Sequence, residues 1–198
     1  MLDPTEVQQV DDAIRHHYRT FWPSAAVEDE VYLDCLVEDR LPGLHIAEIR
    51  PKDWPGITIL ATIGAWTGTR DSNHNLEFLA LATSDVRTVR TRLAKVAYYN
   101  AGPPDHRLGV GHTIPIGEPW VKCSNLDHVL LSVPYLWGPS LEDLVLADRH
   151  IRVLWALPIY RIEAEYRHLH GLEELERKLE ADGVDVLDPF RNPAVQGG

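Results

Sequence analysis

The N-terminal residues carry apolar side chains three or four positions apart, which is the spacing of one face of an α-helix. The repeating positions are Val7, Val10, Ile14, Tyr18 and Phe21. Asp3 is suited to cap such a helix, Pro4 fits its first turn, and Glu6 stands where a capping box needs a carboxylate. We therefore predict an amphipathic helix over residues 4–22 that packs its apolar face on the rest of the domain.

Near position 31 the apolar spacing changes to every second residue, which is typical of half-buried strands. The first alternating run comprises Val31, Leu33, Cys35 and Val37. Further strand-like runs follow at about residues 44–50, 57–66 and 75–83, and a turn-rich stretch from Gly68 to Asn75 separates the last two. These patterns predict consecutive strands.

The second half mixes a helical pattern with strongly apolar segments. A helix is predicted from Ser84 or Asp85 to the Gly-Pro-Pro break at residues 102–104. A loop with one short strand is expected over residues 108–122. The segments 128–136 and 151–159 are apolar almost throughout, so we expect central strands that are covered on both faces.

The C-terminal third returns to helical spacing. Leu172, Leu175 and Leu179 form an apolar stripe on an acidic helix that Gly183 ends, and the tail of residues 192–198 is expected to be loose. Strands in a run, interrupted by helices at irregular intervals, predict an α+β fold with a mixed, mostly antiparallel sheet and helices packed on it. We find no repeat or linker, so one domain over residues 1–198 is the simplest interpretation.

The formal net charge is −11, and the acidic residues gather toward the two ends. Residues 1–40 hold 10 acids and 3 bases, residues 41–136 hold 8 acids and 9 bases, and residues 137–198 hold 12 acids and 7 bases. Phosphate backbones repel such a chain, which argues against nucleic acid as a partner. The same field would speed the encounter with a basic partner protein, although acids also serve simply to keep a protein soluble.

Several features point to a cytoplasmic protein. No apolar run reaches the roughly 18 residues of a membrane span, so no membrane partner is expected. The start MLDPTEVQQVDD is polar and acidic, unlike a signal peptide. Cys35 and Cys123 lie far apart and outside any CxxC motif, which predicts two buried free thiols rather than a disulfide framework or a zinc site.

The sequence lacks the common motifs of catalysis and cofactor binding. GxGxxG, GxxxxGK[ST], GxSxG and HExxH do not occur. Glu165 and His168 share a predicted helix face, but a di-iron bundle needs such a pair twice. We therefore expect no cofactor, no metal and no catalytic residue.

Two Asp-His pairs could in principle orient a base toward a nucleophile such as Ser132. They are Asp105-His106 and Asp127-His128. Because adjacent side chains on an extended chain point apart, a triad built from either pair is disfavoured.

The order of motifs from residue 57 onward is that of a known family. ITILATIGAW is followed by NLEFLALAT, the helix end LAKVAYYN, the turn LGVGHTIPIGEPW and the segment DHVLLSVPYLWGPSL. VLWALPIYRIEAEY, HGLEELERKLE and VDVLDPFR complete the set. Together, residues 44–191 resemble the suppressor of fused family in its short bacterial form. Tyr160 departs from the pattern, which has a small capping residue there, so the start of the following helix is left open.

The resemblance implies a non-enzymatic α+β fold that holds another protein, in the animal members partly by adding a partner strand to a sheet edge. Those members use a tyrosine that matches Tyr99, or Tyr98 if the loop differs by one residue. They also use an aspartate before the turn's histidine, where this chain has Gly111 before His112, so their recognition mode does not carry over unchanged. Bacterial relatives are taken to be immunity proteins, which neutralise a toxin made beside them.

Aromatic residues at predicted loops and strand ends add candidate anchors for a partner. Trp120, Tyr135 and Trp137 are the three, although each is equally suited to the core. The candidate partner-binding residues are thus Tyr98, Tyr99, Gly111, His112, Trp120, Tyr135 and Trp137.

Three hypotheses about function follow. The leading one is a non-catalytic protein-binding domain, most concretely an immunity protein that masks a basic toxin. The second is a hydrolase or transferase with an unrecognised site built from His112, Glu77 and Asp127. The third is a scaffold that acts by self-association, since the oligomeric state is open.

Overall fold

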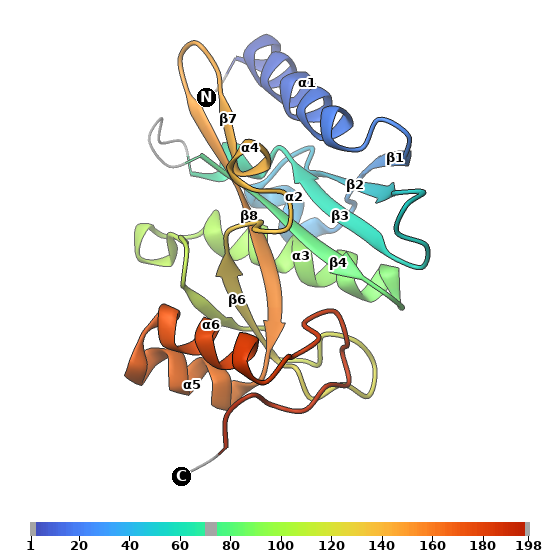
Figure 1. The fold of residues 1–198 in the computed structure, drawn as a ribbon. Helices are drawn as coiled ribbons and strands as arrows, with labels where there is room; N and C mark the ends of the chain where they lie inside the picture. The colour runs from blue at the N-terminus through green and yellow to red at the C-terminus, as the bar shows by residue number, and fades with distance from the viewer. Residues whose placement is uncertain (1–2, 70–74, 197–198) are drawn as a thin grey trace.

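One sheet with helices on both faces forms the described part of this computed structural model, residues 3–69 and 75–196 (Figure 1). Seven strands follow the order β1-β2-β3-β4-β8-β6-β5, and the eighth, β7, pairs with β8 off this path. The β4–β8 pairing is parallel, and the other pairings are antiparallel. The predicted α+β fold with a mixed, mostly antiparallel sheet is confirmed.

The elements have the following bounds. The strands are β1 (Ala26–Val31), β2 (His45–Arg50), β3 (Thr58–Ile63), β4 (Asn75–Ala82), β5 (Thr113–Pro115), β6 (His128–Ser132), β7 (Asp143–Val145) and β8 (His150–Ile159). The α-helices are α1 (Pro4–Phe21), α2 (Cys35–Arg40), α3 (Val86–Asn100), α4 (Pro139–Glu142), α5 (Arg161–His170) and α6 (Leu172–Ala181). Two 3-10 helices are η1 (Ala65–Gly68) and η2 (Pro104–His106). None of the helices in the described ranges combines the length and apolar character of a membrane-spanning segment.

The sheet separates two apolar layers because side chains alternate between its faces. On one face, α2 and α3 cover Leu60, Phe78 and Leu154. On the other face, α1, α4, α5 and α6 cover residues such as Leu79 and Trp155. Figure 1 shows α1 at the top and α5 and α6 at the bottom of the view. The expected double covering of β8 is confirmed.

The N-terminal helix forms as predicted, with one exception at its first turn. Asp3 accepts the backbone N–H of Thr5 at 2.9 Å. Glu6 does not close a capping box but pairs with Arg149. The helix is fixed to the sheet by the Tyr18 hydroxyl, which donates to the carbonyl of Thr62 at 3.1 Å.

The alternating run from Val31 to Val37 was wrongly predicted as a strand. β1 ends at Val31, and the carboxylate of Asp34 accepts the N–H groups of Leu36 and Val37 at 2.9 and 3.3 Å, which starts α2. Leu33 is 86% exposed, so the alternation did not reflect a buried face. The break predicted from Gly68 to Asn75 lies largely outside the described residues.

The predicted burial of both cysteines is also wrong. Cys35 and Cys123 are free and exposed. Cys35 opens α2 on its solvent side, and Cys123 lies in a turn with a φ of 66°.

The open question at Tyr160 is answered by a carboxylate three residues later. Glu163 Oε2 accepts the N–H of Tyr160 at 2.9 Å, so α5 begins at Arg161 without a small cap. The described part of the tail, residues 192–196, is anchored rather than loose, because Glu163 Oε1 also accepts the N–H of Ala194 at 2.9 Å, and Val195 is buried.

Candidate protein-binding site

Four of the predicted partner-binding residues lie around β5, the last strand of the sheet. Tyr98 and Tyr99 occupy the end of α3, and Gly111 and His112 directly precede β5. Tyr98 and Tyr99 line a hollow beside β5, and Tyr99 and His112 line a second one. The fold thus brings these four positions into one region.

The outer edge of β5 offers unpaired backbone groups. The N–H of Leu131 donates to the carbonyl of His112, and the N–H of Ile116 donates to the carbonyl of Asp127, each at 2.9 Å. These bonds turn His112 and Ile116 toward β6. Because backbone groups alternate along a strand, the N–H and C=O of Thr113 and the C=O of Pro115 point away from the sheet. In the described chain no strand pairs with this edge.

A hollow of about 330 Å³ lies on the α3 side of this edge. Its walls come from α2, from the end of α3 and from the β5 region, with Leu36, Tyr98 and Ile114 among the lining residues. The guanidinium of Arg40 lies over the Tyr98 ring at 4.1 Å and holds it at the rim. This hollow joins apolar walls to a free sheet edge, which is the arrangement that strand addition needs.

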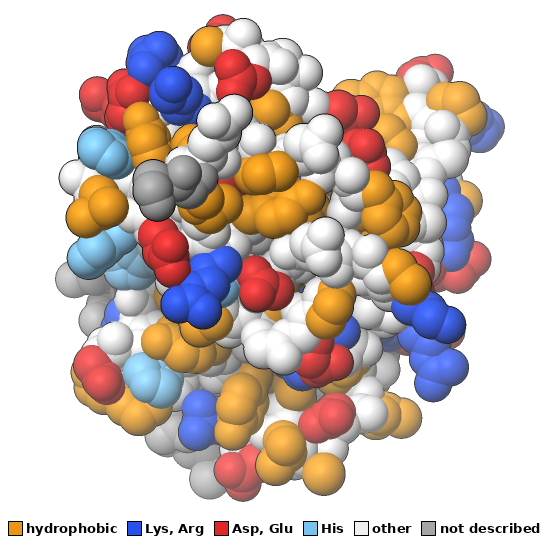
Figure 2. Space-filling view, turned by 90° about the horizontal axis from the view of Figure 1, so that it is seen from below, with side chains coloured by type: hydrophobic (Ala, Val, Ile, Leu, Met, Phe, Trp, Pro, Cys, Tyr) orange, Lys and Arg blue, Asp and Glu red, His pale blue; other side chains and the backbone are white. Residues whose placement is uncertain are grey.

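A third hollow, of about 470 Å³, lies on the α5 side of the same edge. Thr113 and Pro115 face His128 and the α5 residues Glu165 and His168 across it. Figure 2 views the molecule from the side of α5 and α6 and shows hydrophobic side chains interspersed with charged ones and with histidines. Pro115, Ala164 and Leu169 also line this hollow, so a strand laid on β5 would meet apolar walls on the α3 side and mixed polar and apolar walls on the α5 side.

The three other aromatic candidates lie away from β5 or inside the core. Trp120 is 2% exposed and packs in the layer under α3. Tyr135 is 51% exposed and its ring lies 5.0 Å from that of Trp155. Trp137 is partly buried, with its ring 5.5 Å from that of Trp54. Tyr135 and Trp137 thus mark a second aromatic surface, and Trp120 is not accessible to a partner.

The residues proposed for an enzyme site do not converge. Glu77 is fully buried and accepts hydrogen bonds from Thr62 at 2.5 Å and from the N–H groups of Gly64 and Trp66 at 3.0 and 3.1 Å. Burial raises its pKa to about 8, against the opposing effect of these donors. His112 instead lines the hollow near Tyr99, and Glu77 does not.

The Asp-His pairs form no triad either. Asp127 bonds to His128 at 2.7 Å, but the Ser132 hydroxyl bonds to Glu176 at 3.2 Å. His106 stacks on Tyr99 with ring centroids 4.4 Å apart. Within residues 3–69 and 75–196, no group of three or more His, Cys, Asp or Glu side chains is placed to hold a metal ion.

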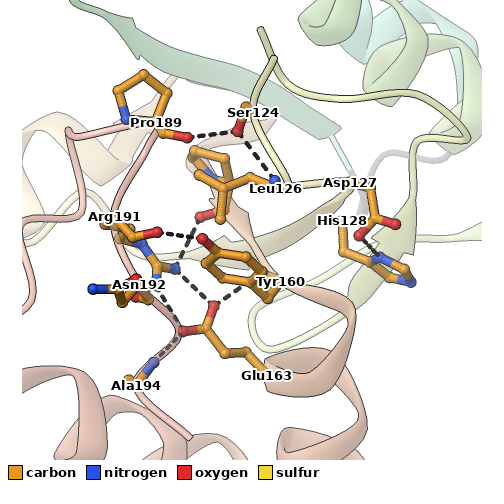
Figure 3. Close-up of polar contacts among 11 residues, drawn as sticks. Ser124, Leu126, Asp127, His128, Tyr160, Glu163, Pro189, Arg191, Asn192 and Ala194 are labelled. Carbon is orange, nitrogen blue, oxygen red and sulfur yellow. Dashed lines mark hydrogen bonds and ion pairs between the residues drawn. The ribbon is translucent and has the colours of Figure 1, made fainter. Parts of the chain in front are cut away.

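A buried ion pair beside β6 and β8 was missed by sequence reasoning. Figure 3 shows Arg191 of the C-terminal segment reaching Glu163 of α5. Nη1 and Nη2 of Arg191 each donate to one carboxylate oxygen of Glu163 at 2.7 Å. The Tyr160 hydroxyl donates to the carbonyl of Arg191, and Ser124 donates to the carbonyl of Pro189 at 2.5 Å. These contacts fix the C-terminal segment against the sheet that carries β5. Nothing local in the sequence links Glu163 to a partner 28 residues away.

The model of one protein family, described as suppressor of fused protein, matches residues 40–192. The chain belongs to the suppressor of fused family. The match begins at the end of α2 and ends in the C-terminal segment, so the family region holds the β5 edge, the hollow on the α5 side and the Glu163–Arg191 pair. The α2 wall of the hollow on the α3 side precedes the matched region.

Solved structures of the family share this fold. A suppressor of fused homologue from Neisseria gonorrhoeae has a TM-score of 0.82 at 26% identity, covering 96% of this chain and 100% of that one. The structure of the Sufu-Fu complex contains a chain with a TM-score of 0.68 at 11% identity, covering 93% of this chain and 92% of that one. Drosophila Suppressor of Fused gives 0.55 at 11% identity over 98% of this chain, which spans 54% of that protein.

One protein with a similar sequence is named for a role in immunity. The immunity protein YqcF of Bacillus subtilis is 31% identical over 72 residues, which is 36% of this chain. The aligned part spans 38% of YqcF. This similarity covers a minority of either chain.

Proposed function

We propose that this suppressor of fused protein is a non-catalytic binding protein whose partner docks along the outer edge of β5. The observation that carries the proposal is the free backbone edge at Thr113 and Pro115, flanked on the α3 side by the hollow that Tyr98 and Tyr99 line. An extended partner segment would gain backbone hydrogen bonds from the edge and side-chain contacts from the hollow.

We further propose that the partner is a toxin and that the chain is its cytoplasmic immunity protein. Support comes from the similarity to YqcF and from the net charge of −11, which favours the encounter with a basic protein. The exposed free thiols of Cys35 and Cys123 suit a reducing compartment.

The test begins with capture of the partner from an extract of the host cell. The immobilised chain is expected to retain one basic protein in a stoichiometric ratio, and adding the chain should abolish that protein's toxic activity. Retention of no specific protein would contradict the immunity proposal.

Variants then locate the docking surface. Thr113→Pro removes an outward N–H while leaving the bonds to β6, and Thr113→Ala is its matched control. Tyr98→Ala removes a wall of the hollow, and truncation of such an anchor weakens binding by roughly tenfold or more. Tyr135→Ala changes an exposed aromatic residue on the other surface. Loss of binding in Tyr135→Ala, with Thr113→Pro and Tyr98→Ala unaffected, would move the interface to the Trp137 surface and leave the immunity role standing.

A further inference from the structure

A polar pocket of about 210 Å³ lies between η2, the start of β5 and α5. Its lining includes Arg107 and His106 from the segment after α3, His112 before β5, and Arg167 from α5. Two arginines and two histidines thus meet in one place on a chain whose net charge is −11.

The two arginines of this pocket have no carboxylate partner. Arginines elsewhere pair closely, such as Arg92 with Glu118 at 3.0 Å and Arg15 with Asp29 at 2.6 Å. Among the described residues, neither Arg107 nor Arg167 forms an ion pair. Asp105 also lines the pocket, and its carboxylate lies beyond ion-pair distance of both guanidinium groups.

Three nitrogens of these side chains are buried without any hydrogen-bond partner. They are Nη1 of Arg107, Nε of Arg167 and Nδ1 of His106. The two arginine nitrogens are cationic donors, and native proteins normally provide an acceptor for such buried donors. Two unpaired arginine donors at one pocket indicate that an acceptor belongs there, whereas Nδ1 of His106 lies beside Gly102, which does not line the pocket.

The pocket is held in this form by its surroundings. Nη2 of Arg107 donates to the carbonyl of Thr69 at 2.9 Å, which fixes the guanidinium. His106 stacks on Tyr99 with an angle of 3° between the rings. Gly111 has a φ of +83°, and a Cβ there would lie 3.0 Å from Nη2 of Arg167. The absence of a side chain at Gly111 therefore gives room to the Arg167 guanidinium.

We propose that this pocket binds an oxyanion, a carboxylate or phosphate group, between Arg107 and Arg167. The planar guanidinium fork matches two oxygens of such a group, and His106 and His112 add donors nearby. Thr113 lines both this pocket and the hollow on the α5 side of β5, so an acidic side chain of a docked segment could reach the arginines. The site does not depend on the proposed function, because a free anion can bind it as well.

The test uses two small probes on the full chain. Inorganic phosphate and the peptide acetyl-Ala-Glu-Ala-amide are titrated at constant ionic strength, with acetyl-Ala-Gln-Ala-amide as the uncharged control. The Nε–H signals of Arg107 and Arg167 are followed by ¹H–¹⁵N NMR. At least one anionic probe is expected to give a saturable shift, and the control peptide none. Saturation by the Glu peptide assigns the site to a carboxylate of a protein partner, and saturation by phosphate alone assigns it to a phosphate group.

Variants distinguish binding at this pocket from a general effect of the positive charge of arginine. Arg107→Gln and Arg167→Gln are expected to weaken probe binding at least tenfold. Arg161→Gln removes an exposed arginine from the same helix, α5, and is expected to bind like the unmodified chain. The backbone amide spectrum of each variant reports whether it is folded. The proposal is overturned if no anionic probe saturates, or if folded Arg107→Gln and Arg167→Gln both bind as tightly as Arg161→Gln.

Discussion

At the scale of single residues, Glu77 shows how burial and hydrogen bonding oppose each other. Its carboxyl accepts three hydrogen bonds, which favour the ionised form, yet complete burial prevails and raises the pKa to about 8. The carboxyl of Asp11, whose pKa burial also raises, lies close enough to add to the effect. Glu77 therefore keeps its proton at neutral pH and acts as a neutral bridge between β3 and η1.

The raised pKa of Glu77 predicts a dependence of stability on pH. Its proton contributes stability that is fully present below the reference pKa of 4.5 and is lost as the pH rises through about 8. Between these values one such group lowers the free energy of unfolding by at most about 1.4 kcal/mol per pH unit. We expect the free energy of unfolding of Glu77→Gln, measured in urea from pH 5 to 9, to lack this decrease with pH. The exposed variant Glu180→Gln should retain it. Parallel curves for Glu77→Gln and the unmodified chain would show that Glu77 is ionised in the folded state.

Gly111 predicts a second effect at this scale. Gly111→Ala places a side chain at φ +83° and against Arg167, whereas Gly117→Ala has a similar φ of +78° and nothing within 4 Å. Each variant should lose about 1 kcal/mol from backbone strain. Gly111→Ala should lose more, because the guanidinium must move, and the two free energies of unfolding from urea titration give the difference. Equal losses would show that Arg167 moves freely.

Some single residues could not be judged from the sequence. The two cysteines were expected to be buried because free cysteine usually is, but their exposure depends on α2 and on the turn at Cys123. Arg107 and Arg167 meet through β5 and α5, which are far apart in sequence, so no local pattern marked the pocket.

At the scale of elements, the sequence predicts strands correctly where the burial of side chains produces the apolar pattern. β2, β3, β4 and β8 have mostly buried residues and were found close to their bounds. The prediction of a strand from Val31 to Val37 failed because the apolar residues of this run are largely exposed. The overlooked signal was Asp34, whose carboxylate caps the start of α2. Pro115 was the available signal for an edge strand at β5.

The Glu163–Arg191 pair predicts how strongly the C-terminal segment is held. The two side chains are 0% and 4% exposed. Glu163→Gln should lose roughly 3–5 kcal/mol of unfolding free energy, because it leaves the arginine charge buried and unpaired. The double variant with Arg191→Met should lose less than the sum of the single changes. The exposed pair Arg161–Glu165 is the control, and Glu165→Gln should cost about 0.5 kcal/mol or less by the same urea titration. Additive losses at Glu163 and Arg191 would show that the pair does not act as a unit.

At the scale of the whole molecule, the acidic residues divide into two kinds. Those of β1 are offset internally, since Glu28 pairs with Arg50 and Glu30 with Arg90. On α6, Glu173 and Glu180 are exposed, and neither forms an ion pair with a described residue. The total charge follows from the sequence, but the pairing of Glu28 and Glu30 with distant arginines is visible only in the structure.

This division predicts unequal effects on association. Removing both α6 charges, with Glu173→Gln and Glu180→Gln, should slow association with a basic partner several-fold at low salt and change dissociation less. Glu28→Gln with Glu30→Gln changes the net charge equally and should have a smaller effect. Stopped-flow association rates at low and high salt measure both variants. If the association rate of the unmodified chain does not change with salt concentration, the electrostatic part of the proposal is wrong.

Because β4 pairs in parallel with β8, the middle of the sheet cannot form until β8 has been synthesised. Asn75 is matched with Ile151 and Leu79 with Trp155, so the middle of the sheet joins segments made far apart in time. β1 to β4 can pair as each is released from the ribosome. The second edge of the apolar β4 then stays unpaired until β8 has been released. Pairing between strands that are far apart in sequence slows folding and leaves an aggregation-prone intermediate. Because β6 and β7 also pair with β8, the sheet can be complete only after residues 150–159 have left the ribosome.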